Sequence, residues 1–169
     1  MNIFVLDENP VKSAQAMDCV RVPKMVTESA QMMASALRRH GATDEDMPLT
    51  KSGSPYKGGY HHHPCTIFAG DTRANFKWLA HHAEALLDEY YHRFGKVHAC
   101  HNPIYQMSSM SKMIPEGELT PFAQAMPDEY KDDDAVKAYR AYYHSKMYSA
   151  GGVHYRHTSP PDWWMGVTA

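Results

Sequence analysis

The stretch Arg21-Val22-Pro23-Lys24-Met25-Val26-Thr27-Glu28-Ser29-Ala30-Gln31 has the two-sided pattern of an α-helix that borders a core. At 3.6 residues per turn, an apolar side and a polar stripe both continue beyond it. The apolar side comprises Met25, Val26, Ser29, Met33, Ala36 and Leu37, and the stripe comprises Arg21, Lys24, Glu28, Gln31 and Ser35. An acid set among basic and amide side chains forms either a solvated face or one wall of a site.

The helix that carries this stretch is predicted to cover residues 10–39. Residues 7–9 provide a capping side chain, and a proline is tolerated in the first turn that follows them. His40-Gly41 ends the helix. Pro23 is expected to kink the helix, or to divide it, one turn before the acid of the stripe. The preceding residues 2–6 predict a short strand or an extended buried segment.

Two more long helices are expected. One covers residues 66–94, and Gly95 closes it. The other covers residues 135–148, after a run of three aspartates that can cap it. Between them, residues 119–130 predict a short helix or a turn flanked by prolines.

Long loops separate these helices. Residues 42–64 are rich in Gly, Pro, Ser, Lys and Tyr, residues 99–118 form a second loop with room for one helical turn, and residues 149–169 form an irregular aromatic tail. No repeat or second domain is visible. We therefore expect a mostly α fold with one compact domain over residues 1–169 and about three long helices.

Composition places the chain among soluble globular proteins, with 43% hydrophobic and 21% charged residues. The net charge of −2 means that no overall field draws the chain to DNA or to an anionic membrane, so DNA contact requires a local basic patch. Three cysteines without a CxxC pair make a disulfide framework unexpected and fit a reducing cytoplasm. There is no signal peptide pattern and no stretch of membrane-spanning length.

Three motifs carry a resemblance to a known family. They are the stripe around Glu28, the aromatic-rich run Asn75-Phe-Lys-Trp-Leu with Glu89-Tyr and Arg93-Phe-Gly95, and the tail Pro161-Asp-Trp-Trp164. In this order they resemble the small pyrimidine-dimer DNA glycosylases of the endonuclease V type. Leu6-Asp-Glu-Asn-Pro10 and Lys24-Met-Val-Thr-Glu28-Ser-Ala-Gln31 also look like a group of uncharacterised phage proteins, which implies a phage-encoded protein that works in the host cytoplasm.

The resemblance implies a catalytic role for Glu28, which matches the family's essential glutamate. In that family the glutamate stabilises positive charge on the sugar and aids proton transfer, which is a role suited to a paired carboxylate. The family's nucleophile is the amine at the chain start, here Met1. It attacks the sugar carbon and forms an imine, and elimination then nicks the strand.

This sequence departs from the family at several of those positions. Asn2 is too large for usual methionine removal, so Met1 is expected to remain. The segment before the helix looks longer, which would move the amine away from the glutamate. Thr27 and Gln31 stand where the family has arginines, and Arg21 and Lys24 are the nearest substitutes. Lys24 is either an alternative amine nucleophile or a pairing partner of the acid.

A DNA-binding groove is the expected setting for the acid. Its candidate contacts are Arg21, Gln31, His63, Arg73, Arg93, Lys96, Lys137, Arg140 and Lys146. The arginines and lysines from Arg73 onward either bind phosphates or lie on ordinary solvated helix faces. Trp163 and Trp164 either stack on bases or pack the tail against the helices.

Histidine and cysteine clusters at residues 61–65 and 98–101 contain zinc-type ligands, but neither has the usual spacing of a zinc site. No dinucleotide or P-loop motif occurs either, so no metal, other cofactor or nucleotide is expected. The leading hypothesis is a DNA glycosylase and abasic-site lyase that acts on a damaged or modified base in duplex DNA. The alternatives are a non-catalytic factor that binds DNA or protein, and a base-modifying enzyme. Dimerisation through methionine-rich helix faces stays open.

Overall fold

The computed structural model describes all residues, 1–169, and the chain start forms an extended buried segment rather than a strand. Ile3, Val5 and Leu6 lie in the core. The strand alternative was wrong because no other strand lies beside this segment. Side chains satisfy its N–H groups instead: the Asn2 Oδ1 accepts from Ile3 N at 2.8 Å, and the Ser13 Oγ accepts from Leu6 N at 3.0 Å. The one β-bridge in the chain joins Leu49 to Pro55.

The first predicted helix is two helices, α1 (Pro10–Ala16) and α2 (Arg21–Arg39). The division falls at residues 17–20 and not at Pro23, which corrects the prediction. Pro23 lies in the first turn of α2, where its missing N–H leaves no helical hydrogen bond unmade. The predicted start and end are confirmed, because the Asn9 side chain caps α1 and α2 ends at His40 before Gly41.

The second predicted helix is also divided, into α3 (Pro64–Asp71) and α4 (Arg73–Phe94). Thr72 is extended, and its hydroxyl accepts a hydrogen bond from the Asn75 N–H, so it caps α4. Gly95 ends α4 in the left-handed conformation, with φ of 65°, as predicted.

The third predicted helix is shorter than expected. The helix α6 covers Ala135–His144, and a 3-10 turn continues it over Ser145–Tyr148. Asp134 is its cap, as the aspartate run indicated. The expected loop at 99–118 contains more than one helical turn, with α5 (His101–Ser108) and a 3-10 turn at Ser111–Met113. Residues 119–127 contain no helix, and a 3-10 turn follows at Asp128–Tyr130.

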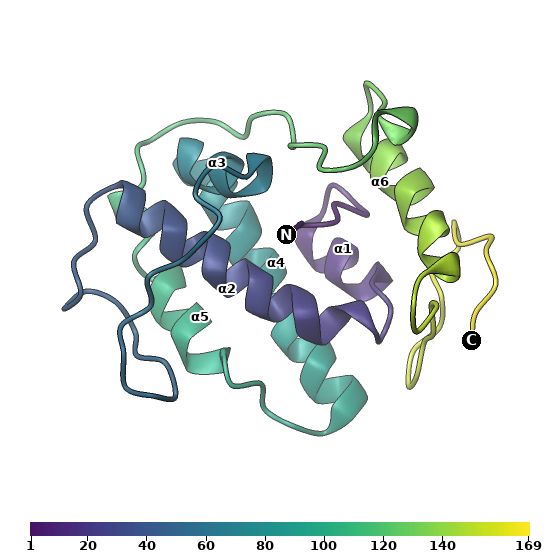
Figure 1. Ribbon diagram of the computed structural model, residues 1–169, viewed down its shortest axis with the longest axis horizontal. Coiled ribbons are helices and arrows are strands. Elements are labelled where there is room, and N and C mark those ends of the chain that lie inside the picture. The colour runs from purple at the N-terminus through teal and green to yellow at the C-terminus, as the bar shows by residue number, and fades with distance from the viewer.

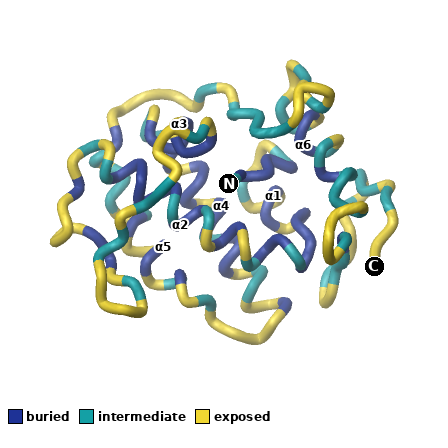
Figure 2. The backbone as a smooth tube through the Cα atoms, viewed as in Figure 1, coloured by how far each residue is buried: buried dark blue, intermediate teal, exposed yellow.

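The six helices surround one core, which confirms the mostly α fold class. The helix α4 packs against α1, α2, α3 and α5, and α2 also packs against α3 and α5. Figure 1 shows α2 and α4 crossing at the centre, the chain start beside them, and α6 with the tail along one flank. The buried parts of the tube in Figure 2 follow α1, α2 and α4, whereas the long loops are exposed. None of the helices combines the length and apolarity that crossing a bilayer requires.

Candidate active site

The carboxylate of Glu28 lies beside the chain start. Its Oε2 accepts a hydrogen bond from the Asn2 backbone N–H at 2.9 Å and lies 3.8 Å from the Met1 amine. Its other oxygen, Oε1, lies 3.8 Å from the Lys24 ammonium. The expectation that a longer start segment moves the amine away from the acid was therefore wrong. The chain starts beside Glu28 on α2, and the residues after Asn2 continue into the core.

The side chain of Asn2 holds the start segment in this position. Its Oδ1 accepts from the N–H groups of Ile3 and Phe4 at 2.8 and 3.2 Å, and its Nδ2 donates to the Ala125 carbonyl at 2.8 Å. Phe4 has a φ of 58°, an uncommon conformation for a residue with a side chain. Sequence reasoning treated Asn2 only as an obstacle to methionine removal and missed its role as an anchor.

Met1 and Lys24 present their amines to Glu28 in different surroundings. The Met1 side chain is only 1% exposed and packs against the core, so the exposed part of this residue is its backbone end. The Lys24 side chain is 70% exposed, against 12% for Glu28. An ammonium in water keeps its hydration, whereas the amine on a fixed backbone is held in one place. The geometry therefore favours Met1 over Lys24 as the better-positioned amine.

His63 lies in the electric field of this pair. It is the cap of α3, and its Nδ1 accepts a hydrogen bond from Cys65 N at 3.1 Å, which leaves its proton on Nε2. Burial lowers the pKa of His63, the positive chain start lowers it further, and the Glu28 charge opposes both effects. His63 is therefore neutral at pH 7 and adds no positive charge beside the amine.

Cys65 is buried beside the Asn2 side chain, which holds the start segment in place. Its Sγ lies 3.9 Å from the Asn2 Oδ1 and 3.8 Å from the Tyr139 hydroxyl. Burial raises the pKa of this thiol to about 11, so it is neither a thiolate nor a nucleophile at neutral pH. All three cysteines are free.

Two of the expected phosphate-binding arginines are buried and bonded inside the protein. Arg21 donates to Asp18 at 3.1 Å and to the Gly152 carbonyl at 2.9 Å. Arg93 donates to Glu89 at 2.9 Å and to the Met17 carbonyl. Their hydrogen bonds connect the corner between α1 and α2 to the tail and to α4, so their observed roles are structural.

The other expected DNA contacts are spread over several surfaces. Arg73 is bonded to residues 112–116, Lys137 pairs with Asp132, and Arg140 donates to the Leu6 carbonyl. Gln31 is half-buried on α2, and Lys96 is exposed after α4. Of the expected cations, Arg21, Lys24 and Lys146 are brought together, on the wall of one pocket of about 290 Å³ that also includes Phe4. The Lys146 ammonium lies 4.0 Å from the centre of the Tyr142 ring.

Trp163 and Trp164 pack against α6. The Trp164 ring stacks on His144 with centroids 4.7 Å apart, and the Arg140 guanidinium lies 5.1 Å from the centre of the Trp163 ring. Both tryptophans are half-buried, and the Trp164 Nε1 is buried without a hydrogen-bond partner. In this arrangement their contacts are with the protein itself.

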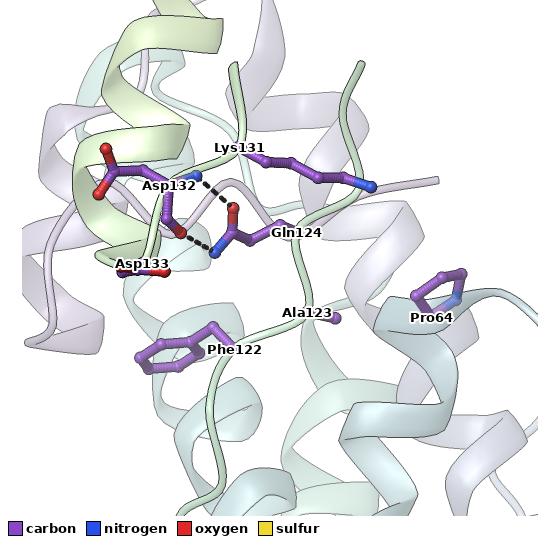
Figure 3. Close-up of a pocket in the computed structure, with 7 residues that line it drawn as sticks. All are labelled: Pro64, Phe122, Ala123, Gln124, Lys131, Asp132 and Asp133. Carbon is purple, nitrogen blue, oxygen red and sulfur yellow. Dashed lines mark hydrogen bonds between the residues drawn. The ribbon is translucent and has the colours of Figure 1, made fainter. Parts of the chain in front are cut away.

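A pocket of about 590 Å³ opens where α3 begins, and Figure 3 shows its lining. The Gln124 side chain spans one wall through two hydrogen bonds with the backbone of Asp132, at 2.6 and 3.1 Å (Figure 3). Asp132 and Asp133 line it together with Lys131. Two carboxylates against one ammonium make this pocket a poor phosphate site.

The histidine and cysteine clusters do not converge on a metal position. No group of three or more His, Cys, Asp or Glu side chains has an arrangement that could hold a metal ion. His63 and His98 instead use their Nδ1 atoms as acceptors for backbone N–H groups, from Cys65 at 3.1 Å and Cys100 at 3.0 Å.

Comparison with known proteins adds one finding. No curated protein and no solved structure matches the chain. The model of the pyrimidine dimer DNA glycosylase family matches residues 1–102, which include Met1, Lys24, Glu28 and His63 and end within α5. The match covers more than half of the chain and leaves α6 and the tail outside it. The chain therefore belongs to the pyrimidine dimer DNA glycosylase family.

Proposed function

We propose that this protein is a DNA glycosylase and abasic-site lyase that acts on a damaged or modified base in duplex DNA. The observation that carries the proposal is the position of the Met1 amine, 3.8 Å from the Glu28 Oε2. Family membership supplies the substrate class, which is DNA. An amine beside a carboxylate provides the two groups that an imine-forming glycosylase requires.

In this reaction the Met1 ammonium first loses a proton to Glu28, and the neutral amine then bonds to the sugar C1′ while the bond between C1′ and the base breaks. The departing base takes the bonding electrons and a proton. Loss of a proton from the attached nitrogen and opening of the sugar ring give an imine, and elimination of the 3′ phosphate then nicks the strand. Glu28 serves as the acid that stabilises positive charge on the sugar and transfers protons, because its Oε2 faces the amine.

The same geometry would also support a reaction in which Met1 is removed and the Asn2 nitrogen is the nucleophile. The Asn2 nitrogen lies closer to Glu28 than the Met1 amine does, at 2.9 Å. If Met1 were removed, the new amine would lie at hydrogen-bond distance from the acid. The buried Met1 side chain, which packs on the core, supports the form in which Met1 is kept.

Borohydride trapping tests the proposal. The purified protein is mixed with a duplex that contains a pyrimidine dimer or an abasic site, and any covalent adduct is mapped by peptide mass spectrometry. We expect an adduct on the chain-start peptide. An adduct on Lys24 instead would identify that lysine as the nucleophile. Salt-dependent DNA binding without any adduct or nicking would overturn the lyase function and favour a binding factor or a base-modifying enzyme.

Glu28→Gln is the matched variant. The glutamine oxygen can still accept from the Asn2 N–H, so the fold of the start segment is retained while the acid is lost. We expect base release and nicking to fall by about 10²-fold or more. Lys77→Gln, which removes an exposed ammonium from α4, serves as the control and should keep wild-type activity.

A further inference from the structure

A second pocket lies farther along the polar stripe of α2. It has a volume of about 390 Å³, and its lining includes Ser35 and Arg39 from α2, Thr66 from α3, and His61 and His62 from the loop before α3. Ser35 and Arg39 follow Glu28 by seven and eleven residues, close to two and three helical turns, so all three lie on the same side of α2. At 1.5 Å per residue, Ser35 lies about 10 Å along the helix axis from Glu28.

The loop before α3 is held against α2 at this pocket. The Ser35 hydroxyl accepts from the Gly59 N–H at 2.8 Å and lies 2.9 Å from the Gly59 carbonyl oxygen, to which it donates. Gly58 lies so close to Ser35 that an added Cβ would be 2.7 Å from its backbone nitrogen. These contacts hold the segment just before His61 and His62, which line the pocket although both lie in a long loop.

Thr66 provides a donor without a partner. It is 4% exposed and lines the pocket, and its hydroxyl makes no hydrogen bond within the protein. It is the third residue of α3, so its backbone N–H has no acceptor within the helix. The start of an α-helix carries partial positive charge and attracts anions. A buried hydroxyl without a partner is costly, so an acceptor that enters the pocket and reaches this group would stabilise the site.

Arg39 adds a full positive charge. Its Nη1 donates to the Ile67 carbonyl at 3.2 Å and to Asp71 Oδ1 at 3.0 Å. Its Nε and Nη2 make no hydrogen bond in the protein, and the side chain is 45% exposed. One edge of the guanidinium is therefore fixed by α3, and the other is available for a ligand.

We propose that this pocket, formed by α2 and α3, binds a backbone phosphate of the DNA strand. Its available groups are donors and positive charge, which suits a tetrahedral oxyanion, and Asp71 is already paired with Arg39. The identification of the ligand as DNA rests on the proposed function. Ser35 lies about 10 Å along α2 from Glu28, so a phosphate held in this pocket would belong to a nucleotide near the one that meets the acid. The pocket would then fix the register of the strand relative to Glu28.

The salt dependence of DNA binding tests this proposal. The affinity for a duplex with a tetrahydrofuran abasic analogue is measured by fluorescence anisotropy over a series of salt concentrations. The variants are Arg39→Gln, which removes an exposed charge, and Thr66→Val, which keeps the side-chain shape and removes an unpartnered hydroxyl. Lys77→Gln is the control for the loss of one exposed charge elsewhere.

We expect Arg39→Gln to weaken binding and to reduce the slope of log K against log salt by about 0.9, the value for one phosphate contact. Thr66→Val should weaken binding roughly two- to ten-fold, as expected for one hydrogen bond. A slope for Arg39→Gln equal to that of Lys77→Gln would overturn the proposal. Inorganic phosphate separates the two sources of a phosphate group: if it shifts the Thr66 amide resonance but the slope is unchanged, the pocket holds free phosphate and not the strand.

Trapping separates this proposal from the function on which it rests. With saturating protein, both pocket variants should form the borohydride adduct as the wild type does, because neither residue touches the Met1 amine or Glu28. Absence of an adduct in the wild type, together with a reduced slope in Arg39→Gln, would remove the lyase function and leave the phosphate pocket in place.

Discussion

At Gly58 the long loop lies against the α2 backbone. The φ of this glycine is +81°, and an added Cβ would lie 2.3 Å from the Ser35 Oγ and 2.7 Å from the Ser35 nitrogen. Gly53 in the same loop has a similar φ of +83° but open space around it. Substitution of each glycine by alanine therefore distinguishes the cost of backbone strain, which both share, from the cost of a steric clash, which only Gly58 has.

We predict that Gly58→Ala lowers the free energy of unfolding by about 3 kcal/mol and Gly53→Ala by about 1 kcal/mol. Both alanines incur the cost of a left-handed backbone, and only the first also collides with the α2 backbone. Urea unfolding measures both values. Equal losses would show that the loop moves away from Ser35 at little cost.

His82 is a fully buried side chain whose protonation opposes folding. Its Nδ1 donates to the Pro10 carbonyl at 3.0 Å, its ring stacks on Trp78, and burial lowers its pKa to about 4. In the unfolded chain its pKa is about 6.5. The unfolded state therefore binds more protons between these values, and stability from this residue is complete above pH 6.5 and is lost as the pH falls towards 4.

We predict a loss of about 3 kcal/mol in the free energy of unfolding from this residue across that interval. His82→Gln should flatten the dependence of stability on pH, as measured by urea unfolding at several pH values. His81→Gln is the control, because His81 is the exposed neighbour on the same helix. The same flattening in both variants would mean that the pH dependence arises elsewhere.

Among the helices, α3 and α4 are two helices and not one because the chain is extended at Thr72. Its hydroxyl accepts from the Asn75 N–H at 3.1 Å and donates to the Glu118 carbonyl at 2.9 Å. We predict that Thr72→Ala lowers the free energy of unfolding by about 1–2 kcal/mol and that Thr72→Ser retains most of it. Thermal unfolding followed by circular dichroism measures both. A serine variant as unstable as the alanine variant would show that the methyl group, and not the cap, matters.

The same two helices show what the sequence could and could not predict. Helical periodicity runs through Thr72 without interruption, so one helix over residues 66–94 was predicted. The break has a local component, the Thr72 cap on the Asn75 N–H, and a distant one, the hydrogen bond from Thr72 to the Glu118 carbonyl, which no local pattern contains. At Pro23 the sequence predicted a break that does not occur. A proline in the first turn of a helix and a proline in its interior cannot be distinguished until the helix start is known.

The candidate site also has parts that the sequence could predict and parts that it could not. Glu28 and Lys24 were predictable as partners because a helix places residues four apart on one face. The approach of Met1 was not, since it depends on a buried turn of the start segment and on the Asn2 bond to the Ala125 carbonyl. From the sequence, Arg21 and Arg93 were predicted to line a DNA-binding groove. They are buried because each donates to a backbone carbonyl far away in the sequence, that of Gly152 for Arg21 and that of Met17 for Arg93.

Over the whole molecule, Asp18 joins the part that the family model matches to the part beyond it. The Tyr143 hydroxyl of α6 donates to Asp18 Oδ1 at 2.5 Å, and Arg21 donates to the same oxygen at 3.1 Å. From the tail, the His154 N–H donates to Oδ2 at 3.4 Å. Burial, and then the Asp18 charge, raise the pKa of Tyr143, so its hydroxyl remains a donor. This carboxylate is fully buried and connects three separate segments.

We predict that Asp18→Asn lowers the free energy of unfolding by about 3 kcal/mol, because the Arg21 charge is left buried without its partner. Tyr143→Phe should lose about 1 kcal/mol, since it removes one hydrogen bond. Hydrogen exchange of the amides in residues 152–156 should accelerate in Asp18→Asn, because the tail is bonded to this carboxylate and to Arg21. Asp88→Asn, on an exposed position of α4, is the control. If Asp18→Asn matched that control in stability and exchange, contacts other than those of Asp18 would hold α6 and the tail.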